Sequence, residues 1–282
     1  MPLVFCIIYP MKNAQIFRTA DGSVGLYNKE LDEIYHSREG AQKESIEKFI
    51  IPSDFEQRTK NSPCIRVLDV CYGIGYNSKN ALCYYKNCDI IIDALEWDFE
   101  LVEYSKTADF YLPEINEFLR GERKLGNSKI TFYTDDARKS ILELNEPYDV
   151  IFLDAFAPNK LPTLWSVEFF AQLKRLLLQD GVLVTYCSAQ PVRKAMILNN
   201  FFVGKMLDNK NHSFVTIAAL NEKLIKFPLD EIELGLTNTK AGIPYRDCDL
   251  NSSAKEMFKR RENEVKNSNL EGASAYLRRF AK

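Results

Sequence analysis

The sequence predicts an α/β protein built around a doubly wound, mostly parallel β-sheet. From about residue 65 onward, short runs rich in β-branched and aromatic residues alternate with segments of helical periodicity. Such alternation is typical of strand–helix–strand units in a parallel sheet. Acidic residues or glycines follow the first four predicted strands, at the sheet edge where open α/β sheets bind ligands. The last two strands have no helix between them, and we expect them to form an antiparallel hairpin.

The composition is that of an ordinary globular protein. Of the 282 residues, 46% are hydrophobic and 27% are charged, and the formal net charge is -2. A nearly neutral chain carries no global signature of nucleic-acid binding, so an RNA partner would have to bind a local basic patch. No apolar run approaches the ~20 residues that span a bilayer, so we expect no membrane contact.

Cysteine and histidine usage argues against a metal site. Seven cysteines form no CxxC pair, and the two histidines are His36 and His212. Zinc or iron sites of the usual Cys/His kind are therefore not expected. The apolar first ten residues lack the basic segment of a signal peptide, and Met11 is an alternative start. We expect a cytoplasmic protein with reduced thiols.

Three regions are predicted, at residues 12–60, 61–222 and 223–282. In the first, a turn at residues 20–23 separates two extended runs, and a helical pattern ends near residue 51. His36 lies in the loop before that helix, where a surface role is the default interpretation and substrate contact the alternative. The third region holds a charged helix that we predict at residues 252–267.

The elements of the central region follow from the periodicity in order. Strands are expected at residues 65–70, 90–95, 130–133, 150–153, 182–187, 201–207 and 214–220. Helices are expected at residues 76–85, 98–112, 137–144, 164–177 and 192–200. These seven strands form the predicted sheet.

A glycine-rich turn follows the first strand of the sheet. Gly73 and Gly75 stand between Asp69, near the strand end, and Asn77, in the next helix. Glycines let the backbone approach a ligand closely, and the following helix N-terminus favours an anionic group. The third glycine of a dinucleotide fingerprint is replaced by Ser78, which argues against a nicotinamide-dependent dehydrogenase.

Carboxylates close the next three strands. Glu96, about 20 residues beyond the glycine turn, is placed to accept both hydroxyls of a ribose. Asp136 is placed to accept from an adenine amine, with Asp135 as the adjacent alternative. Asp154 closes the fourth strand. Each is more often a helix cap when taken alone, but capping alone does not explain the ordered set, which is typical of class I S-adenosylmethionine-dependent methyltransferases.

One stretch resembles a named family. Residues 154–165, DAFAPNKLPTLW, are similar to the D-[AG]-F-A-P-x-K-x-P-x-[ML]-W signature of the methyltransferases that complete 5-methylaminomethyl-(2-thio)uridine at the tRNA wobble position. The resemblance extends from about residue 20 to about residue 261 and includes Tyr35-His36-Ser37, Ser188-Ala189 and the PYRD element at 244–247. The chain departs from the pattern at Cys71, where the family has a glycine, and at residues 208–212. No FAD fingerprint is present, so the oxidase half of bifunctional members is not expected.

The resemblance implies a cofactor, a partner and residue roles. The cofactor would be S-adenosyl-L-methionine, and the partner would be a tRNA anticodon stem-loop, contacted by the basic residues Lys255, Lys259, Arg260, Arg261 and Lys266. Asp154 would orient the acceptor amine and draw off its proton, or only orient it. Phe156 or Tyr35 would stack on the flipped-out base, and Pro158 would help to wall the site. Cofactor contacts would come from Asp69, Gly73, Gly75, Asn77, Glu96, Trp97, Asp135, Asp136, Ala137 and Asp154.

Two other functions are compatible with the sequence. A polyamine aminopropyltransferase also carries an acidic residue after its third strand and a YDVIxxD strand, but it has no need for the Phe156–Pro158 wall or a basic tail. Alternatively, Cys71 would mark a decayed cofactor pocket in a protein that only binds RNA. An assay of the acceptor, putrescine or tRNA, distinguishes the aminopropyltransferase from the methyltransferase. A cofactor-binding assay distinguishes either enzyme from a protein that only binds RNA.

Overall fold

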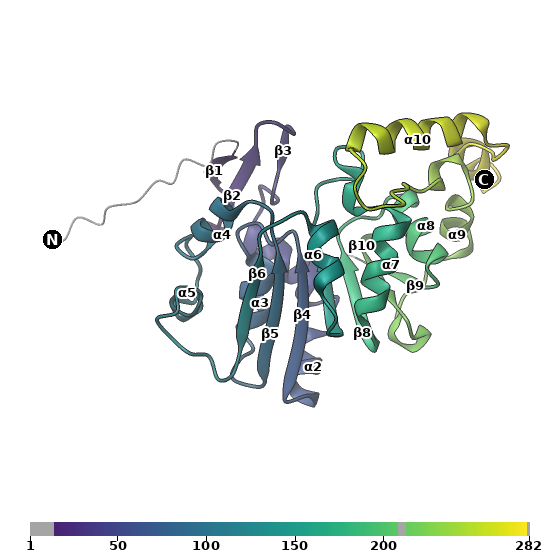
Figure 1. The fold of residues 1–282 in the computed structure, drawn as a ribbon. Helices are drawn as coiled ribbons and strands as arrows, with labels where there is room; N and C mark the ends of the chain where they lie inside the picture. Colours follow the sequence, from purple (N-terminus) through teal and green to yellow (C-terminus); the bar gives the residue numbers. More distant parts are fainter. Residues whose placement is uncertain (1–13, 208–212, 281–282) are drawn as a thin grey trace.

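The computed structural model describes residues 14–207 and 213–280. Several predictions lie outside these ranges. They concern Met11 as the start, residues 12 and 13 of the first predicted region, the departure from the family pattern at 208–212 with His212, and the last two residues of the chain. Figure 1 shows the chain arranged around one twisted sheet, with a small second sheet near its N-terminal end.

The central sheet has the seven strands that the sequence predicts. Its order is β6-β5-β4-β7-β8-β10-β9, and β10 pairs antiparallel with both of its neighbours. The terminal hairpin and the mostly parallel sheet are therefore confirmed. The strands are β4 (Cys64–Val70), β5 (Asp89–Leu95), β6 (Lys129–Tyr133), β7 (Tyr148–Leu153), β8 (Leu177–Thr185), β9 (Phe202–Leu207) and β10 (Ser213–Ala219).

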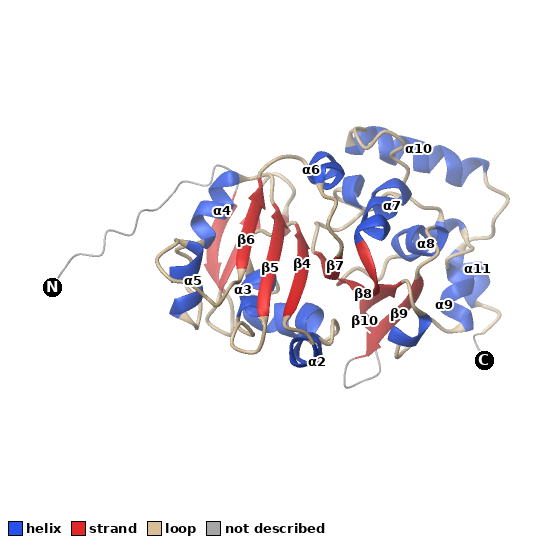
Figure 2. Cartoon of the chain, turned by 60° about the horizontal axis from the view of Figure 1, so that its bottom comes forward, coloured by secondary structure: helices blue, strands red, loops and turns tan. Residues whose placement is uncertain are grey.

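Helices cover both faces of this sheet (Figure 2). Alternate side chains of one strand belong to different cores: Ile151 and Leu153 pack on one face, and Val150 and Phe152 on the other, as the two-residue period of a strand requires. The first face is covered by α6 (Ala137–Glu143), α7 (Val167–Leu176) and α8 (Gln190–Leu198). The second is covered by α2 (Phe55–Asn61), α3 (Tyr76–Leu82), α4 (Phe99–Ser105) and α5 (Pro113–Leu119).

Two predicted helices are wrong in extent. The helix expected at 98–112 is two helices, because α4 ends at Ser105 and Pro113 begins α5. Proline fits the first turn of a helix but not its interior. The helix expected at 164–177 starts only at Val167, after a short 3-10 turn (Pro162–Leu164). It ends before Leu177, because Leu177 is the first residue of β8 and pairs with Tyr148 of β7. Helix α2 was not predicted.

The N-terminal region forms a separate three-stranded sheet of β1 (Ala14–Arg18), β2 (Val24–Asn28) and β3 (Glu33–Ile34). The first two strands match the predicted runs, and β3 is additional. Helix α1 (Ala41–Ser45) continues as a π-helical turn, Ile46–Ile50. The hydroxyl of Tyr76 accepts a hydrogen bond from Val24 N at 2.8 Å, so this sheet is attached to the start of α3.

The C-terminal region covers one edge of the central sheet. Its elements are two 3-10 turns (Glu222–Leu224, Lys240–Gly242), α9 (Glu231–Leu236), α10 (Ala254–Asn267) and α11 (Ala273–Leu277). Lys205 N donates to Phe227 O at 2.8 Å, and Leu229 N donates to Val203 O at 3.3 Å. Gly204 lies at the crossing, where a Cβ would stand 2.6 Å from Phe227 O. The free edge of β9 is thereby paired.

The charged helix predicted at 252–267 is α10, which begins at Ala254 after the capping residue Ser253. Among the described residues, no helix is long and apolar enough to cross a membrane.

Candidate active site

The four predicted strand ends meet at one edge of the sheet. Strands β6, β5, β4 and β7 are adjacent and parallel, so their carboxyl ends lie side by side. Cys71 lies among them: burial raises the pKa of its thiol well above the ordinary value, and four carboxylates add to that shift. They belong to Glu96, Asp154, Asp69 and Asp136. The structure thus brings the sequence-predicted acids together.

The turn after β4 follows a left-handed backbone path. Cys71, Gly73 and Gly75 have φ angles of 67°, 59° and 83°. Cys71 therefore adopts the conformation that favours the glycine it replaces. At Gly75 a Cβ would stand 2.3 Å from the ring of Tyr72, whereas at Gly73 the nearest atom, in Tyr35, would be 3.8 Å away. A Cβ at Gly73 would therefore make only an ordinary van der Waals contact.

Glu96 joins this turn to the start of α4. Its Oε2 accepts from Gly73 N at 2.8 Å and its Oε1 from Asp98 N at 3.0 Å. The side chain is 7% exposed, and burial raises its pKa to about 7. A carboxylate has about four acceptor positions, so two bonds leave capacity for a ligand. Trp97, the next residue, is 79% exposed and offers a free aromatic surface.

Asp136 is a helix cap and also half of an ion pair. It accepts from Arg138 N at 2.9 Å, and the Arg138 guanidinium contacts both of its oxygens, the closest at 2.6 Å. Burial alone would raise the pKa of Asp136, but the bonds from Arg138 outweigh it and lower that pKa. Asp135 is exposed and accepts from Asp136 N at 2.6 Å. Ala137, half-buried, begins α6.

Arg138 ties this corner to the C-terminal region. Its Nη1 donates to Asp247 Oδ2 at 2.9 Å and to Ser252 O at 2.8 Å. Asp247 is fully buried, and its Oδ1 accepts from two backbone N–H groups, of Asn251 and Ser252. The PYRD aspartate is therefore a structural anchor. Sequence reasoning missed Arg138, whose partner is distant in the chain.

Asp154 is half-buried at the end of β7. Its backbone N donates to Val70 O at 3.1 Å, and its Oδ2 accepts from the amide of Asn77 at 3.0 Å. Burial raises its pKa to about 8, and the negative charge of Glu44 acts in the same direction. Asn77 comes from the helix after the glycine turn, so the predicted catalytic acid and the predicted cofactor loop are in direct contact.

Glu44 was not among the predicted residues. Its oxygens accept from Ser37 N and from Lys48 Nζ, each at 2.6 Å. His36 packs edge-on against Tyr76 with ring centroids 5.2 Å apart, and burial lowers its pKa to about 4. The His36 side chain is therefore half-buried against α3, and the expectation that it has no functional role stays a prediction.

Aromatic side chains wall the space beside Asp154. The rings of Tyr35 and Phe156 meet edge-to-face at 4.9 Å. Two side chains bind the backbone of the loop that carries Phe156. Trp165 Nε1 donates to Phe156 O, and the Tyr186 hydroxyl donates to Ala155 O, each at 2.8 Å. Trp165 is fully buried. Trp165 of the signature is thus bonded to the loop, and Tyr186 is a further contributor that the sequence did not reveal.

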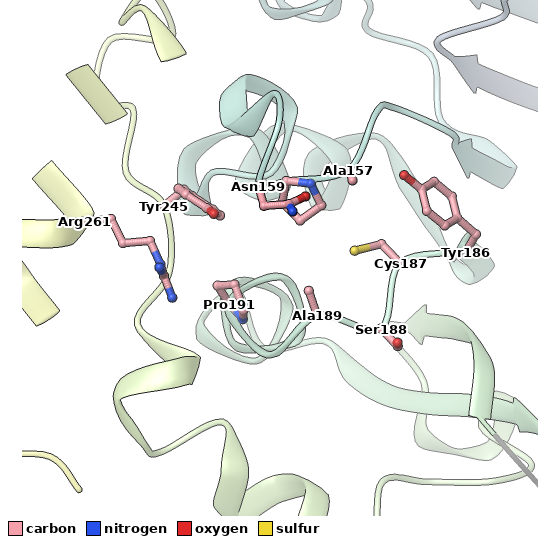
Figure 3. A pocket seen from close by; sticks show the side chains of 10 residues that line it. Ala157, Asn159, Tyr186, Cys187, Ser188, Ala189, Pro191, Tyr245 and Arg261 are labelled. Carbon is pink, nitrogen blue, oxygen red and sulfur yellow. The ribbon is translucent and has the colours of Figure 1, made fainter. Parts of the chain in front are cut away.

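A cavity of about 530 Å³ adjoins this loop (Figure 3). Residues of three segments line it: Ala157, Pro158 and Asn159; Tyr186, Cys187, Ser188, Ala189 and Pro191; and Tyr245 and Arg261. The backbone carbonyls of Ile243 and Ala241 accept from Arg261, at 2.7 and 3.2 Å, and Arg246 O accepts from Arg260 at 2.6 Å. These two arginines therefore also hold the preceding loop.

The residues at the strand ends fit S-adenosylmethionine, which presents hydroxyls, amines and a positive charge. Glu96 retains acceptor capacity, and Trp97 is an exposed ring beside it. Asp69 is fully buried, with Oδ2 accepting from the Ser78 hydroxyl at 2.6 Å and Oδ1 buried without a hydrogen-bond partner. Burial raises the pKa of Asp69 to about 6. Within the described ranges, no group of three or more His, Cys, Asp or Glu side chains is placed to hold a metal ion.

Comparison with known proteins agrees with this geometry. A family model described as S-adenosyl-L-methionine-dependent methyltransferase matches residues 101–221. The crystal structure of MnmC2 from Aquifex aeolicus is similar with a TM-score of 0.79 and 32% identity, covering 90% of this chain and 86% of that chain. An uncharacterized protein of Methanocaldococcus jannaschii is 30% identical over 262 residues, which is 88% of this chain and 71% of that protein.

A longer relative is also similar. The tRNA 5-methylaminomethyl-2-thiouridine biosynthesis bifunctional protein MnmC of Azoarcus sp. is 24% identical over 217 residues, 70% of this chain. The match covers 34% of that protein, so this chain spans about a third of the bifunctional relative.

Proposed function

Because the chain belongs to the family of S-adenosylmethionine-dependent methyltransferases that includes MnmC2 of Aquifex aeolicus, we propose that it methylates a wobble uridine of tRNA. The acceptor is the primary amine of 5-aminomethyl-(2-thio)uridine, and the product is 5-methylaminomethyl-(2-thio)uridine. The observation that carries this proposal is Asp154: a carboxyl group bonded to the cofactor-side Asn77 and walled by aromatic rings. Such a site suits a cationic amine on a flat base.

When bound, S-adenosylmethionine would supply an electrophilic methyl group on a sulfonium, whose methyl–sulfur bond breaks to release the neutral thioether S-adenosylhomocysteine. The residues of this chain prepare the acceptor nitrogen. An alkylammonium has no lone pair, so one proton must leave the nitrogen before the new carbon–nitrogen bond forms. Oδ2 of Asp154 accepts from Asn77, and we assign Oδ1 as the acceptor of that proton.

The pKa of Asp154 suits this role. With a pKa of about 8, the carboxyl group of the free enzyme is largely protonated at neutral pH. An arriving ammonium favours the ionised form, because an opposite charge nearby lowers a carboxyl pKa. A base whose pKa lies near the working pH transfers protons efficiently in both directions. Orientation of the nitrogen against the methyl donor would contribute further, by up to ~7–11 kcal/mol in well-ordered cases.

The remaining predicted residues receive roles on the same basis. Glu96 would accept from the ribose hydroxyls, Trp97 would pack on the adenine, and Asp136 or Asp135 would accept from its amine. The turn of Gly73 and Gly75, with Asp69 and Asn77, would surround the amino-acid end, and Ala137 would border the adenine. The flipped-out base would stack on Phe156 or Tyr35, and exposed basic residues of α10 would contact phosphates of the anticodon stem-loop.

A transfer assay tests the proposal. Purified protein is incubated with S-adenosylmethionine and tRNA that carries the unmethylated aminomethyl group. The mass of the wobble nucleoside is then measured by mass spectrometry. The expected result is a gain of one methyl group. Asp154→Ala should lower kcat by about 10²–10⁴-fold, the usual range for a general base, and this loss should remain at saturating S-adenosylmethionine.

Asp154→Asn distinguishes the two possible roles of the carboxyl group. The amide retains a hydrogen-bond acceptor but cannot take the proton, so an active Asn variant would leave orientation as the sole role. Wild-type protein that leaves the tRNA unchanged but transfers an aminopropyl group to putrescine from decarboxylated cofactor would overturn the proposal. Failure to bind S-adenosylmethionine at all would also overturn it, in favour of an RNA-binding role.

A further inference from the structure

The cavity behind the Ala157–Asn159 loop has no part in the mechanism described above. Its volume of about 530 Å³ lies within the ~300–1,000 Å³ typical of ligand sites. Its lining comes from the end of β8, the signature loop and the C-terminal region, which are far apart in the sequence (Figure 3). It is therefore a site assembled by the fold and not a feature of one loop.

The cavity and Asp154 share a wall. Ala157, Pro158 and Asn159 follow Asp154 in one loop, and they line the cavity. Tyr186 lies on the opposite wall from Arg261 in Figure 3. Its hydroxyl donates a hydrogen bond to Ala155 O at 2.8 Å. The cavity therefore adjoins the loop that begins at Asp154 and carries Phe156.

Arg261 gives the cavity its charge. Two of its nitrogens, Nε and Nη2, are held by the carbonyls of Ile243 and Ala241, and its guanidinium carbon is 5.1 Å from the centre of the Tyr245 ring. The side chain is thus fixed in one pose, with Nη1 outside these two bonds. An arginine immobilised in this way is preorganised to bind a phosphate or carbonyl oxygen.

The rest of the lining is aromatic, apolar or backbone. Tyr186 and Tyr245 face the cavity with alanine and proline between them, and Figure 3 shows the hydroxyl end of Tyr245 directed toward the centre. Tyr245 is 4% exposed and packs against Phe258, so the half-buried Tyr186 is the ring that can stack. An aromatic ring beside an arginine is a usual combination for a base and phosphate of single-stranded nucleic acid. We propose that this cavity binds the nucleotide next to the target uridine, with its base against Tyr186 and an oxygen on Arg261. The proposal rests on the proposed function.

The test measures whether the cavity and one flanking base are energetically coupled. Anticodon stem-loop RNAs are made intact or with an abasic residue on the 5′ or the 3′ side of the wobble uridine, and binding is followed by fluorescence anisotropy with S-adenosylhomocysteine present. Ala189→Phe fills the cavity, because Ala189 lines it. Ala275→Phe is the matched control: it adds the same ring at an exposed alanine of α11, which does not line the cavity.

One abasic RNA should bind the wild-type protein about tenfold more weakly, as expected for one stacked base. Ala189→Phe should bind the intact RNA about tenfold more weakly and lose nothing further with the abasic RNA. Arg261→Lys should also weaken binding of the intact RNA, whereas Ala275→Phe should match the wild type. Calorimetric binding of S-adenosylmethionine verifies that each variant is folded.

Either of two results would overturn the proposal: wild-type affinity of Ala189→Phe for the intact RNA, or a full abasic penalty on both sides in that variant. The failure of the proposed function gives a different result. In that case the wild-type protein binds none of the stem-loops, or binds them and transfers no methyl group to the intact one.

Discussion

Asp247 is a buried carboxylate that joins Arg138, and through it Asp136, to the C-terminal region, so its removal tests how that region is attached. We consider Asp247→Ala. The substitution removes one of the two acceptors of Arg138 Nη1, which keeps Ser252 O, and the acceptor of the backbone N–H groups of Asn251 and Ser252. The neighbouring Asp249→Ala is the matched control, because Asp249 is exposed in the same loop.

The expected loss in the free energy of unfolding depends on which hydrogen-bond acceptors each donor keeps. A buried donor left without its partner costs about 1–3 kcal/mol. Arg138 keeps Asp136 as a second carboxylate, so the full ~3–5 kcal/mol for an orphaned buried charge does not apply. Water can reach Asn251 and Ser252, which are not buried. We therefore expect a loss of about 3 kcal/mol in the free energy of unfolding.

Thermal unfolding followed by circular dichroism measures this loss. At about 2–4 °C per kcal/mol, Tm should fall by roughly 6–12 °C for Asp247→Ala and stay close to the wild-type value for Asp249→Ala. A fall of less than about 2 °C would refute the reasoning, because it would mean that the Arg138–Asp247 contact contributes no net stability. Asp247→Asn should lie between the two, since its amide oxygen still accepts from the backbone.

Three other predictions concern the site. Glu96→Ala should weaken S-adenosylmethionine binding by roughly 10- to 100-fold, the value of hydrogen bonds to a charged group, and calorimetry showing unchanged affinity would contradict the assignment. In the wild type, kcat/KM should rise with pH toward about 8, because the raised pKa of Asp154 keeps the carboxyl protonated below that value; Asp154→Asn should lose this rise, and an unaltered profile would exclude Asp154 as its source. Replacing Lys255 and Lys259, both exposed on α10, with Ala should lower the salt dependence of RNA binding by about one unit per phosphate contact, and an unchanged slope would exclude this face.

The alternation of strands and helices was enough to predict the central sheet and its acidic edge. In a parallel sheet the carboxyl ends of the strands lie on one side, so Glu96, Asp136 and Asp154 could be placed together from their positions after strands. The boundaries that failed have local causes. Pro113 starts a second helix where a single one was expected, and Leu177 is apolar in either a helix or a strand until its partner Tyr148 is known.

The supporting contacts could not be predicted because they join distant parts of the chain. Arg138 and Asp247 are 109 positions apart, and neither residue type is informative alone. The effect of Glu44 on Asp154 depends on how the N-terminal region folds over the sheet. Tyr186 has no sequence signal beyond standing at the end of a strand. The roles given to the strand-end residues stay predictions until the variants are measured.

The pairing of residues 227–229 with β9 has a consequence for how the protein can be divided. A chain cut at residue 222, the predicted end of the central region, would expose the backbone N–H and C=O groups on the outer edge of β9. An unpaired edge strand is a template for pairing with another molecule. The shortened protein should therefore self-associate and precipitate, even though it retains the residues proposed to bind the cofactor. We therefore expect the C-terminal region to be needed for solubility as well as for the contacts of Arg138.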